Sequence, residues 1–150
     1  EVVVVVFRVV VAGSRGFANA ELLGRKLSHL LANYSDICII SGCARGADSL
    51  GEQWALANSH KVLRMPAEWH VYGKSAGYKR NVAMAEAANA CVVFWDGKSR
   101  GSQHMINICE QRVRHKQIIM RSQASECCKP MKVYLLYWRS IQCNRVSIVT

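Results

Sequence analysis

The sequence is poor in acidic residues. It has 10 Asp and Glu against 20 Lys and Arg, which gives a formal net charge of +10. This excess favours anionic partners such as a nucleotide, a nucleic acid or an acidic surface. A basic domain with a solvated positive face is the equally weighted alternative. The 150 residues are 51% hydrophobic, which predicts one domain with a substantial core.

Motifs for metals, membranes and secretion are also missing. The seven cysteines form no C-x-x-C pair and have no zinc-type spacing with histidine, so we predict no metal site. Scattered thiols of this kind indicate a reducing, cytoplasmic location. The valine-rich start is interrupted by Arg8 and is too short to span a membrane, and it lacks the basic region of a signal peptide.

Two common nucleotide-binding motifs are absent as well. No G-x-G-x-x-G follows the first predicted strand, and no G-x-x-x-x-G-K-[ST] occurs. The chain therefore has neither an ordinary dinucleotide-binding Rossmann fingerprint nor a P-loop.

Strand and helix patterns alternate along the chain, which predicts a Rossmann-like α/β fold with a parallel sheet of about five strands and helices on both faces. The expected strands are Phe7–Ala12, Ile37–Ile40, Lys61–Met65, Cys91–Trp95 and Gln117–Met120. Asn19 is expected to cap the first helix. The segment Ala67–Ser75 is expected to be irregular, and a helix is expected over Ala76–Ala88.

The end of the chain differs in pattern. We assign residues 7–121 to the nucleotide-binding domain and leave 122–150 as an unassigned C-terminal extension. Within it, Lys132–Trp138 and Arg145–Val149 have the composition of strands, but no helix pattern joins them. They are expected to form either an antiparallel edge or a tail.

The stretch Ser41–Asp48 is the most informative part of the sequence. It follows an apolar strand and opens a helix, so backbone N–H groups and the positive end of a helix dipole meet there. Phosphate is the usual ligand of such a site. Gly42 and Gly46 allow close approach to the backbone.

All strands of a parallel sheet end at the same edge, so the loops after several strands gather there. Arg15, Arg45, Lys74, Arg80 and Arg100 would supply positive charge. Trp69 would stack on a base or close the pocket. The residues predicted to bind the ligand are Gly13, Ser14, Arg15, Ser41, Gly42, Ala44, Arg45, Gly46, Asp48, Trp69, Lys74, Arg80, Asn81, Gly97, Ser99, Gly101 and Ser102.

Several blocks together resemble a known family. The blocks are Gly13-Ser14-Arg15-x-Phe17, Ser41-Gly42-x-Ala44-Arg45-Gly46-Ala47-Asp48, Pro66-Ala67-x-Trp69, Gly73-Lys74-x-Ala76-Gly77, Arg80-Asn81 and Phe94-Trp95-Asp96-Gly97-x-Ser99-x-Gly101. Over about residues 8–120 they look like the YspA/YpsA-related branch of the SLOG superfamily, which unites the DNA-processing protein A domain and the "lonely guy" phosphoribohydrolases. Members of this branch are common in bacteria and phages.

The resemblance implies a Rossmann-like domain that binds a nucleotide or nucleotide-derived ligand, as a sensor or signal-processing module, and in which copies self-associate. It implies no further cofactor. In the phosphoribohydrolases a glutamate after the second glycine loop supports N-glycosidic cleavage, together with an arginine. Arg80 fits that arginine, but Gln103, His104 and Met105 stand where the glutamate would be. Asp96, at the end of a strand, is the first candidate to replace it.

Three functions therefore stay open: nucleotide binding without turnover, N-glycosidic cleavage of a nucleoside monophosphate or ADP-ribose-type substrate, and binding of single-stranded DNA. The missing glutamate favours the first, and the absence of an aromatic-basic ladder disfavours the third. Cys43 replaces a glycine that is usual in the family, which is unfavourable if that position has a positive φ.

Overall fold

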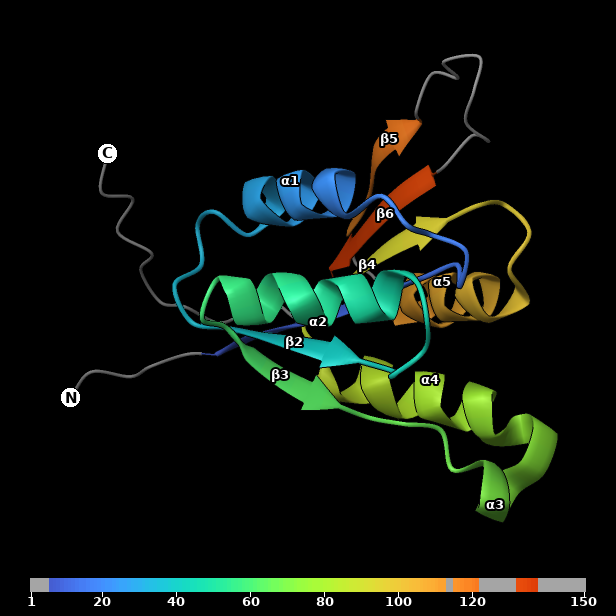
Figure 1. The fold of residues 1–150 in the computed structure, drawn as a ribbon. Helices are drawn as coiled ribbons and strands as arrows, with labels where there is room; N and C mark the ends of the chain where they lie inside the picture. Colours follow the sequence, from blue (N-terminus) through green and yellow to red (C-terminus); the bar gives the residue numbers. More distant parts are fainter. Residues whose placement is uncertain (1–5, 113–114, 122–131, 138–150) are drawn as a thin grey trace.

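The computed structural model describes residues 6–112, 115–121 and 132–137 (Figure 1). The helices and strands follow one another as β1 (Phe7–Gly13), α1 (Ala20–Leu30), β2 (Ile37–Ser41), α2 (Ala47–Ala57), β3 (Lys61–Arg64), α3 (Trp69–Tyr72), η1 (Gly73–Ser75), α4 (Ala76–Ala87), β4 (Ala90–Trp95), α5 (Arg100–Arg112), β5 (His115–Arg121) and β6 (Lys132–Tyr137).

The strands form one sheet in the order β3-β2-β1-β4-β6-β5. The pairs β3–β2, β2–β1 and β1–β4 are parallel, which confirms the Rossmann-like α/β class. The prediction of about five parallel strands is corrected to four adjacent ones. The reason is that β6 pairs antiparallel with both β4 and β5 and so separates them.

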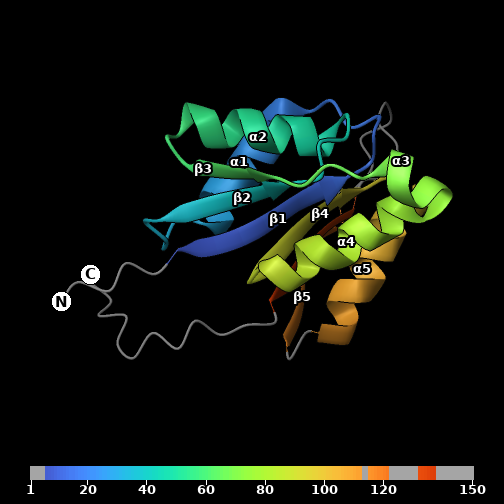
Figure 2. The same ribbon diagram turned by 90° about the horizontal axis from the view of Figure 1, so that it is seen from below.

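Helices cover both faces of the sheet. Figure 2 shows α1 and α2 on one side and α4 and α5 on the other. Alternate residues of β1 serve the two cores, since Val9 and Val11 pack with α1 and α2, whereas Val10 and Ala12 pack with α4 and α5. A strand buried on both faces reads as a continuous apolar run, which is why β1 lacks polar alternation.

The first helix begins as its sequence predicts. The Asn19 side chain accepts a hydrogen bond of 2.9 Å from the Leu22 N–H, so Asn19 is the N-cap. Leu23 and Leu27, one turn apart, are fully buried against the sheet. This spacing places both side chains on one face of α1.

The segment predicted to be irregular, Ala67–Ser75, contains α3 and η1 instead, so that prediction is wrong. The N–H groups of Val71 and Tyr72 both bond to the Glu68 carbonyl, at 3.0 Å. Gly73, at φ 55°, ends this turn. A helix of one turn is too short to show hydrophobic periodicity, which explains why the sequence pattern does not reveal it.

Near the C-terminus, the predicted strands Gln117–Met120 and Lys132–Trp138 correspond to β5 and β6. β6 lies inside the sheet rather than at its edge, and β5 is the edge strand. The prediction for Arg145–Val149 lies outside the described residues. Among the residues that the structure describes, no helix is both long and apolar enough to cross a membrane.

Candidate functional site

The carboxyl ends of β1 and β4 are neighbours at the point where the strand order reverses. From β1 the chain continues to β2 and β3 on one side, and β4 lies on the other. Ligands of open α/β sheets bind at such a point. A cavity of about 310 Å³ lies there, lined by Ala12, Gly13, Arg15, Ala44, Asp48, Arg80, Asn81, Met84, Ser99, Arg100, Gly101, Ser102 and Met105.

The loop after β1 is packed tightly against two others. A Cβ at Gly13 would lie 2.3 Å from the Phe94 carbonyl oxygen. The buried Ser14 hydroxyl accepts a hydrogen bond of 3.1 Å from the Asp96 N–H. Gly46, at φ 82°, has no room for a Cβ, because the Ser14 carbonyl oxygen would be 2.3 Å away. These contacts hold the ends of β1, β2 and β4 in fixed positions around the cavity.

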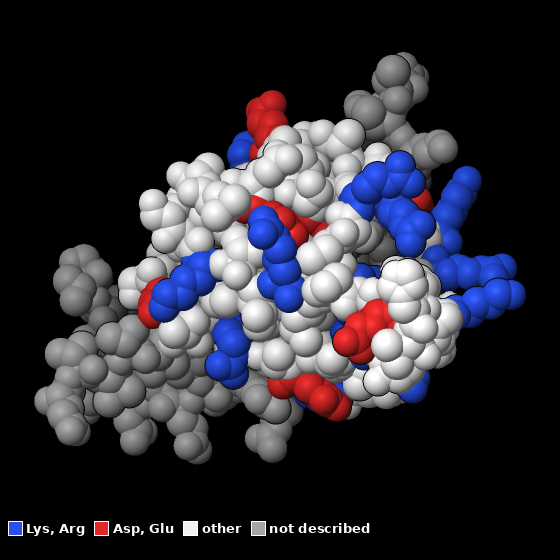
Figure 3. All heavy atoms as spheres, turned by 60° about the horizontal axis from the view of Figure 1, so that its bottom comes forward, with Lys and Arg blue, Asp and Glu red and all other residues white. Residues whose placement is uncertain are grey.

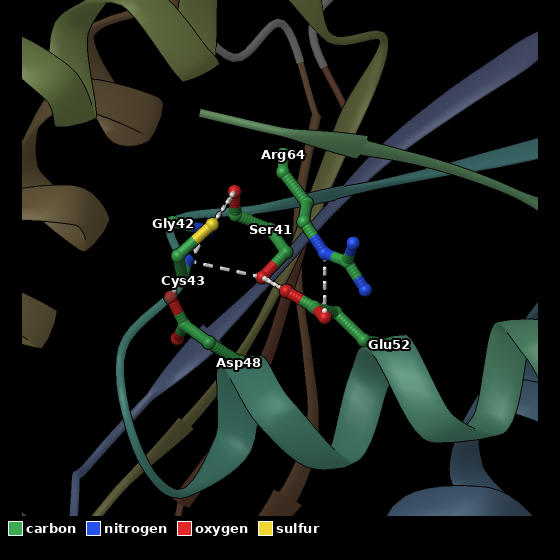
Figure 4. A network of polar contacts seen from close by, with 6 residues as sticks. All are labelled: Ser41, Gly42, Cys43, Asp48, Glu52 and Arg64. Carbon is green, nitrogen blue, oxygen red and sulfur yellow. Dashed lines mark hydrogen bonds and ion pairs between the residues drawn. The ribbon is translucent and has the colours of Figure 1, made fainter. Parts of the chain in front are cut away.

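A polar network fixes the end of β2 (Figure 4). The Ser41 hydroxyl donates to Glu52 Oε1 at 2.6 Å and accepts from the Cys43 N–H at 3.1 Å. Glu52 Oε2 accepts from Arg64 Nε at 3.0 Å. Ser41 is therefore bound within the protein, and this network positions the loop rather than lining the cavity.

Cys43 has a positive φ, 60°. This is the conformation in which cysteine, in place of the family's usual glycine, was expected to be unfavourable. A non-glycine residue in the left-handed region is strained by contact of its Cβ with the backbone. Burial raises the pKa of the Cys43 thiol above its ordinary value, and the nearby Glu52 adds to this effect. The thiol is therefore no activated nucleophile at neutral pH.

Asp48, in the first turn of α2, is the acidic member of the cavity lining. Asp48 is only 4% exposed to solvent. Oδ2 accepts a hydrogen bond of 3.1 Å from the Gly42 N–H, and the Ala44 backbone N–H also bonds the carboxylate. Burial raises the pKa of Asp48 to about 6, although Arg80 and these two N–H groups oppose the rise. Figure 4 shows the carboxylate pointing from α2 toward Gly42 and Cys43.

Arg80 and Asn81 connect α4 to the loops. The Arg80 guanidinium donates from Nη1 to the Gly42 carbonyl and from Nε to Asn81 Oδ1 at 3.2 Å. Asn81 Nδ2 donates to the Gly101 carbonyl at 3.2 Å and lies 3.2 Å from His104 Nδ1. Burial lowers the pKa of Arg80 below its ordinary value. This pair joins the loop after β2 to the start of α5.

The loop after β4 is braced by Asp96. Its Oδ1 accepts from the N–H groups of Lys98 and Ser99, at 2.8 and 2.9 Å, and Gly97 has φ 82°. The Ser99 N–H is the main reason that the pKa of Asp96 is lowered. Asp96 does not line the cavity, and these hydrogen bonds are typical of an Asx turn. Its predicted catalytic role stays a prediction.

The first turn of α5 faces the cavity through Arg100, Gly101 and Ser102. The Ser102 hydroxyl lies 3.2 Å from Ser99 Oγ, to which it donates. Backbone N–H groups at the start of a helix have no partner within the helix. The Ser102 N–H also bonds Ser99 Oγ, at 3.5 Å, and the Gln103 N–H bonds the Ser99 carbonyl. The N–H groups of Arg100 and Gly101 and the Ser99 hydroxyl therefore form a site that suits an anion.

The cavity brings together only part of the predicted set. The predicted residues that line it are Gly13, Arg15, Ala44, Asp48, Arg80, Asn81, Ser99, Gly101 and Ser102. The predicted residues that do not line it are Ser14, Ser41, Gly42, Arg45, Gly46, Trp69, Lys74, Asp96 and Gly97. Trp69 is 51% exposed on α3. Their roles in ligand binding remain predictions.

Sequence reasoning missed Ala12, Met84 and Met105 among the lining residues. Met84 follows Arg80 by four residues, and Met105 follows Gly101 by four. Residues four apart share one face of a helix, so this spacing was the available signal. The two methionines give the cavity an apolar wall.

Positive charge dominates the lining. It contains Arg15, Arg80 and Arg100 against one carboxylate, Asp48. Figure 3 shows Lys and Arg side chains gathered toward the right of one face, the side to which β2 and β3 point in Figure 1. The described residues hold no group of three His, Cys, Asp or Glu side chains placed to bind a metal ion.

The fold and this edge define a Rossmann-like domain with glycine loops at the switch point of its sheet. The family model of the YspA, cpYpsA-related SLOG family matches residues 7–72. The Gene 61 protein of Mycobacterium phage D29 is 31% identical over 104 residues, which are 65% of this chain and 83% of that protein. The chain belongs to the YspA, cpYpsA-related SLOG family.

The matched residues 7–72 extend from β1 to α3. They include the loops after β1 and β2, but not Arg80 or the loop at 96–102. The predicted resemblance reached further, to about residue 120. Family membership associates the chain with nucleotide-related ligands at a coarse level.

Proposed function

We propose that this protein binds a nucleotide or nucleotide-derived ligand in the cavity at the carboxyl ends of β1, β2 and β4, as a sensor or signal-processing module. The proposal rests above all on one observation. A cavity of about 310 Å³ joins Arg15, Arg80 and Arg100 to the start of α5. Guanidinium groups and helix N-termini are the two features that proteins most often direct at phosphate.

The size of the cavity limits the ligand. Small-molecule pockets range from about 300 to 1,000 Å³, and this one, at about 310 Å³, lies at the lower end. A nucleoside monophosphate or another ligand of that size suits it better than a dinucleotide. The apolar wall of Met84 and Met105 offers a surface for the less polar part of the ligand.

The first test identifies the ligand. Small molecules released from the purified, heat-denatured protein are analysed by mass spectrometry, and mononucleotides are then titrated by calorimetry. Arg15→Gln is the informative variant, since Arg15 lines the cavity and is exposed. Arg25→Gln, an exposed position on α1, is the matched control. Arg15→Gln should weaken binding at least about tenfold, and Arg25→Gln should not. Binding of a single-stranded oligonucleotide, but of no mononucleotide, would overturn the proposal.

A second candidate is N-glycosidic cleavage. The observation that favours it is the buried carboxylate of Asp48, whose pKa is about 6, in the same cavity as Arg80. A carboxyl group with a pKa near the working pH suits general acid–base catalysis. Incubation with nucleoside monophosphates and with ADP-ribose should release free base or ribose phosphate. Asp48→Asn and Asp96→Asn, compared side by side, decide which carboxylate takes part. Bound ligand without release excludes turnover.

A further inference from the structure

We infer that Asp48 is the residue that binds the ribose hydroxyls of the ligand, so that this site selects ribonucleotides over 2′-deoxyribonucleotides. The inference rests on the proposed nucleotide site and names its sugar. It comes from the position of one buried carboxylate in the cavity lining, near Arg80 and two backbone N–H groups, with Glu52 as a more weakly acting acidic neighbour.

The Asp48 carboxylate has free capacity for hydrogen bonds. An ionised carboxylate has about four acceptor positions, whereas Gly42 and Ala44 supply two N–H groups. The positive charge of Arg80 favours the ionised form of Asp48 and lowers its pKa. The hydrogen bonds that Arg80 donates, however, go to the Gly42 carbonyl and to Asn81. Among the described residues, Asp48 has no ion pair within 4.0 Å.

A buried carboxylate with unused acceptor positions is costly, unless a donor arrives with the ligand. Asp48 is 4% exposed and lines the cavity, so a ligand in the cavity can reach it. It cannot face the phosphate, because two negative charges would repel each other. The phosphate should therefore lie near Arg100 and Gly101 at the start of α5, and Asp48 should face a part of the ligand that donates hydrogen bonds.

Vicinal hydroxyl groups fit this requirement. Two adjacent O–H groups can donate to both oxygens of one carboxylate, and ribose carries such a pair next to the phosphate-bearing carbon chain. Acidic residues take this role at the ribose of other nucleotide sites on doubly wound sheets. An amino group of the base is the competing donor, so the test must separate sugar from base.

The experiment compares ligands that differ by one oxygen atom. Wild-type protein is titrated with AMP, GMP, CMP and UMP and with the corresponding 2′-deoxynucleotides, and then with ribose 5-phosphate and 2-deoxyribose 5-phosphate, which have no base. Asp48→Asn and Glu86→Gln are titrated in parallel. Glu86 is an exposed acid on α4, paired with Arg112 and outside the cavity, and it serves as the matched control.

The wild type and Glu86→Gln should bind the ribo form of the preferred nucleotide at least about tenfold more tightly than the deoxy form. Asp48→Asn should reduce this ratio to less than about threefold. Equal affinity of the wild type for both forms would overturn the inference and leave the proposed function intact. This comparison needs no variant, so it stands even if Asp48→Asn does not fold. If no nucleotide or sugar phosphate binds, the proposed function itself fails, and the inference with it.

Discussion

Arg80 on α4 donates a hydrogen bond to the carbonyl oxygen of Gly42, 38 residues earlier in the chain. The same guanidinium is bound to Asn81, and Asn81 bonds the Gly101 carbonyl at the start of α5. Two helices and the loop after β2 are thereby connected through one arginine. Gly42 is also the residue whose N–H bonds Asp48, so Arg80 stabilises the loop that orients the buried carboxylate.

Replacement of Arg80 by Gln should destabilise the fold as well as weaken ligand binding. A hydrogen bond that involves a charged, partly buried group contributes about 1.5–3 kcal/mol, and the Arg80–Gly42 bond is of this kind. The free energy of unfolding, measured by urea denaturation, should fall by about that amount. Arg25→Gln on the exposed face of α1 should change it by less than about 0.5 kcal/mol. Equal stabilities of the two variants would contradict the bracing role of Arg80.

Cys43→Gly should stabilise the protein. The left-handed conformation at φ 60° costs a non-glycine residue about 1–2 kcal/mol. Glycine, in turn, lowers the free energy of unfolding by about 0.4–1 kcal/mol, because it increases the conformational entropy of the unfolded chain. The strain is the larger effect, so the net gain should be about 0.5–1 kcal/mol, seen as a higher midpoint of thermal unfolding. Ser59, at φ 59°, lies at the other end of α2 and is not part of the cavity lining. Ser59→Gly should give a similar gain, and a loss of stability in both variants would refute the strain argument.

The order of strands and helices could be predicted from the sequence, because β1, β2 and β4 are largely buried on both faces and are apolar except for Arg8 and Ser41. The position of β6 could not. Strand composition does not specify which neighbour a strand pairs with, and β6 pairs with β4 and β5 through the backbone. The single turn of α3 was hidden for a different reason, since four residues do not show a helical period.

Parts of the candidate site could be predicted from glycines in the loops and from the position of a residue relative to the end of a strand or the start of a helix. Gly13 and Gly46 mark close approaches of the backbone, and Arg80 follows the first turn of its helix. Ser41 shows the limit of this reasoning, because a hydroxyl at a loop suits a ligand and an internal partner equally. In this structure the Ser41 hydroxyl binds two internal partners, Glu52 and the Cys43 N–H. Burial of a particular carboxylate, as at Asp48, depends on packing of distant segments and cannot be read from sequence.

Gly46→Ala should be among the most damaging single changes to the loop. The added Cβ would lie 2.3 Å from the Ser14 carbonyl oxygen, and the position has φ 82°. Clash and strain act together, so the free energy of unfolding should fall by at least about 2 kcal/mol. Gly16→Ala is the control, because its Cβ would have no neighbour within 4 Å. A Gly46→Ala variant as stable as Gly16→Ala would mean that the loop can move away without cost.

Asp48 should make the stability of the protein fall as the pH rises from about 4 to about 7. Its pKa in the folded protein is about 6, raised from 3.8 by burial. The folded state therefore holds a proton that the unfolded state releases over this interval, and stability falls with pH where the folded state binds more protons. The effect is bounded at about 3 kcal/mol, since each pKa unit corresponds to about 1.36 kcal/mol.

The measurement is urea unfolding of the wild type and of Asp48→Asn at pH 4 and pH 7. The stability of the wild type relative to the variant should decrease between the two values. Asp96→Asn should instead change little between these two values, because both lie above the ordinary Asp pKa of 3.8. The pKa of Asp96 is lowered by the Ser99 and Lys98 N–H groups, so its contribution is present above the unfolded pKa and is lost as the pH falls through the folded one. If the difference between wild type and Asp48→Asn did not change with pH, the Asp48 carboxylate would be ionised at little cost in the folded protein. Its burial at the cavity would then impose no need for a donor from the ligand.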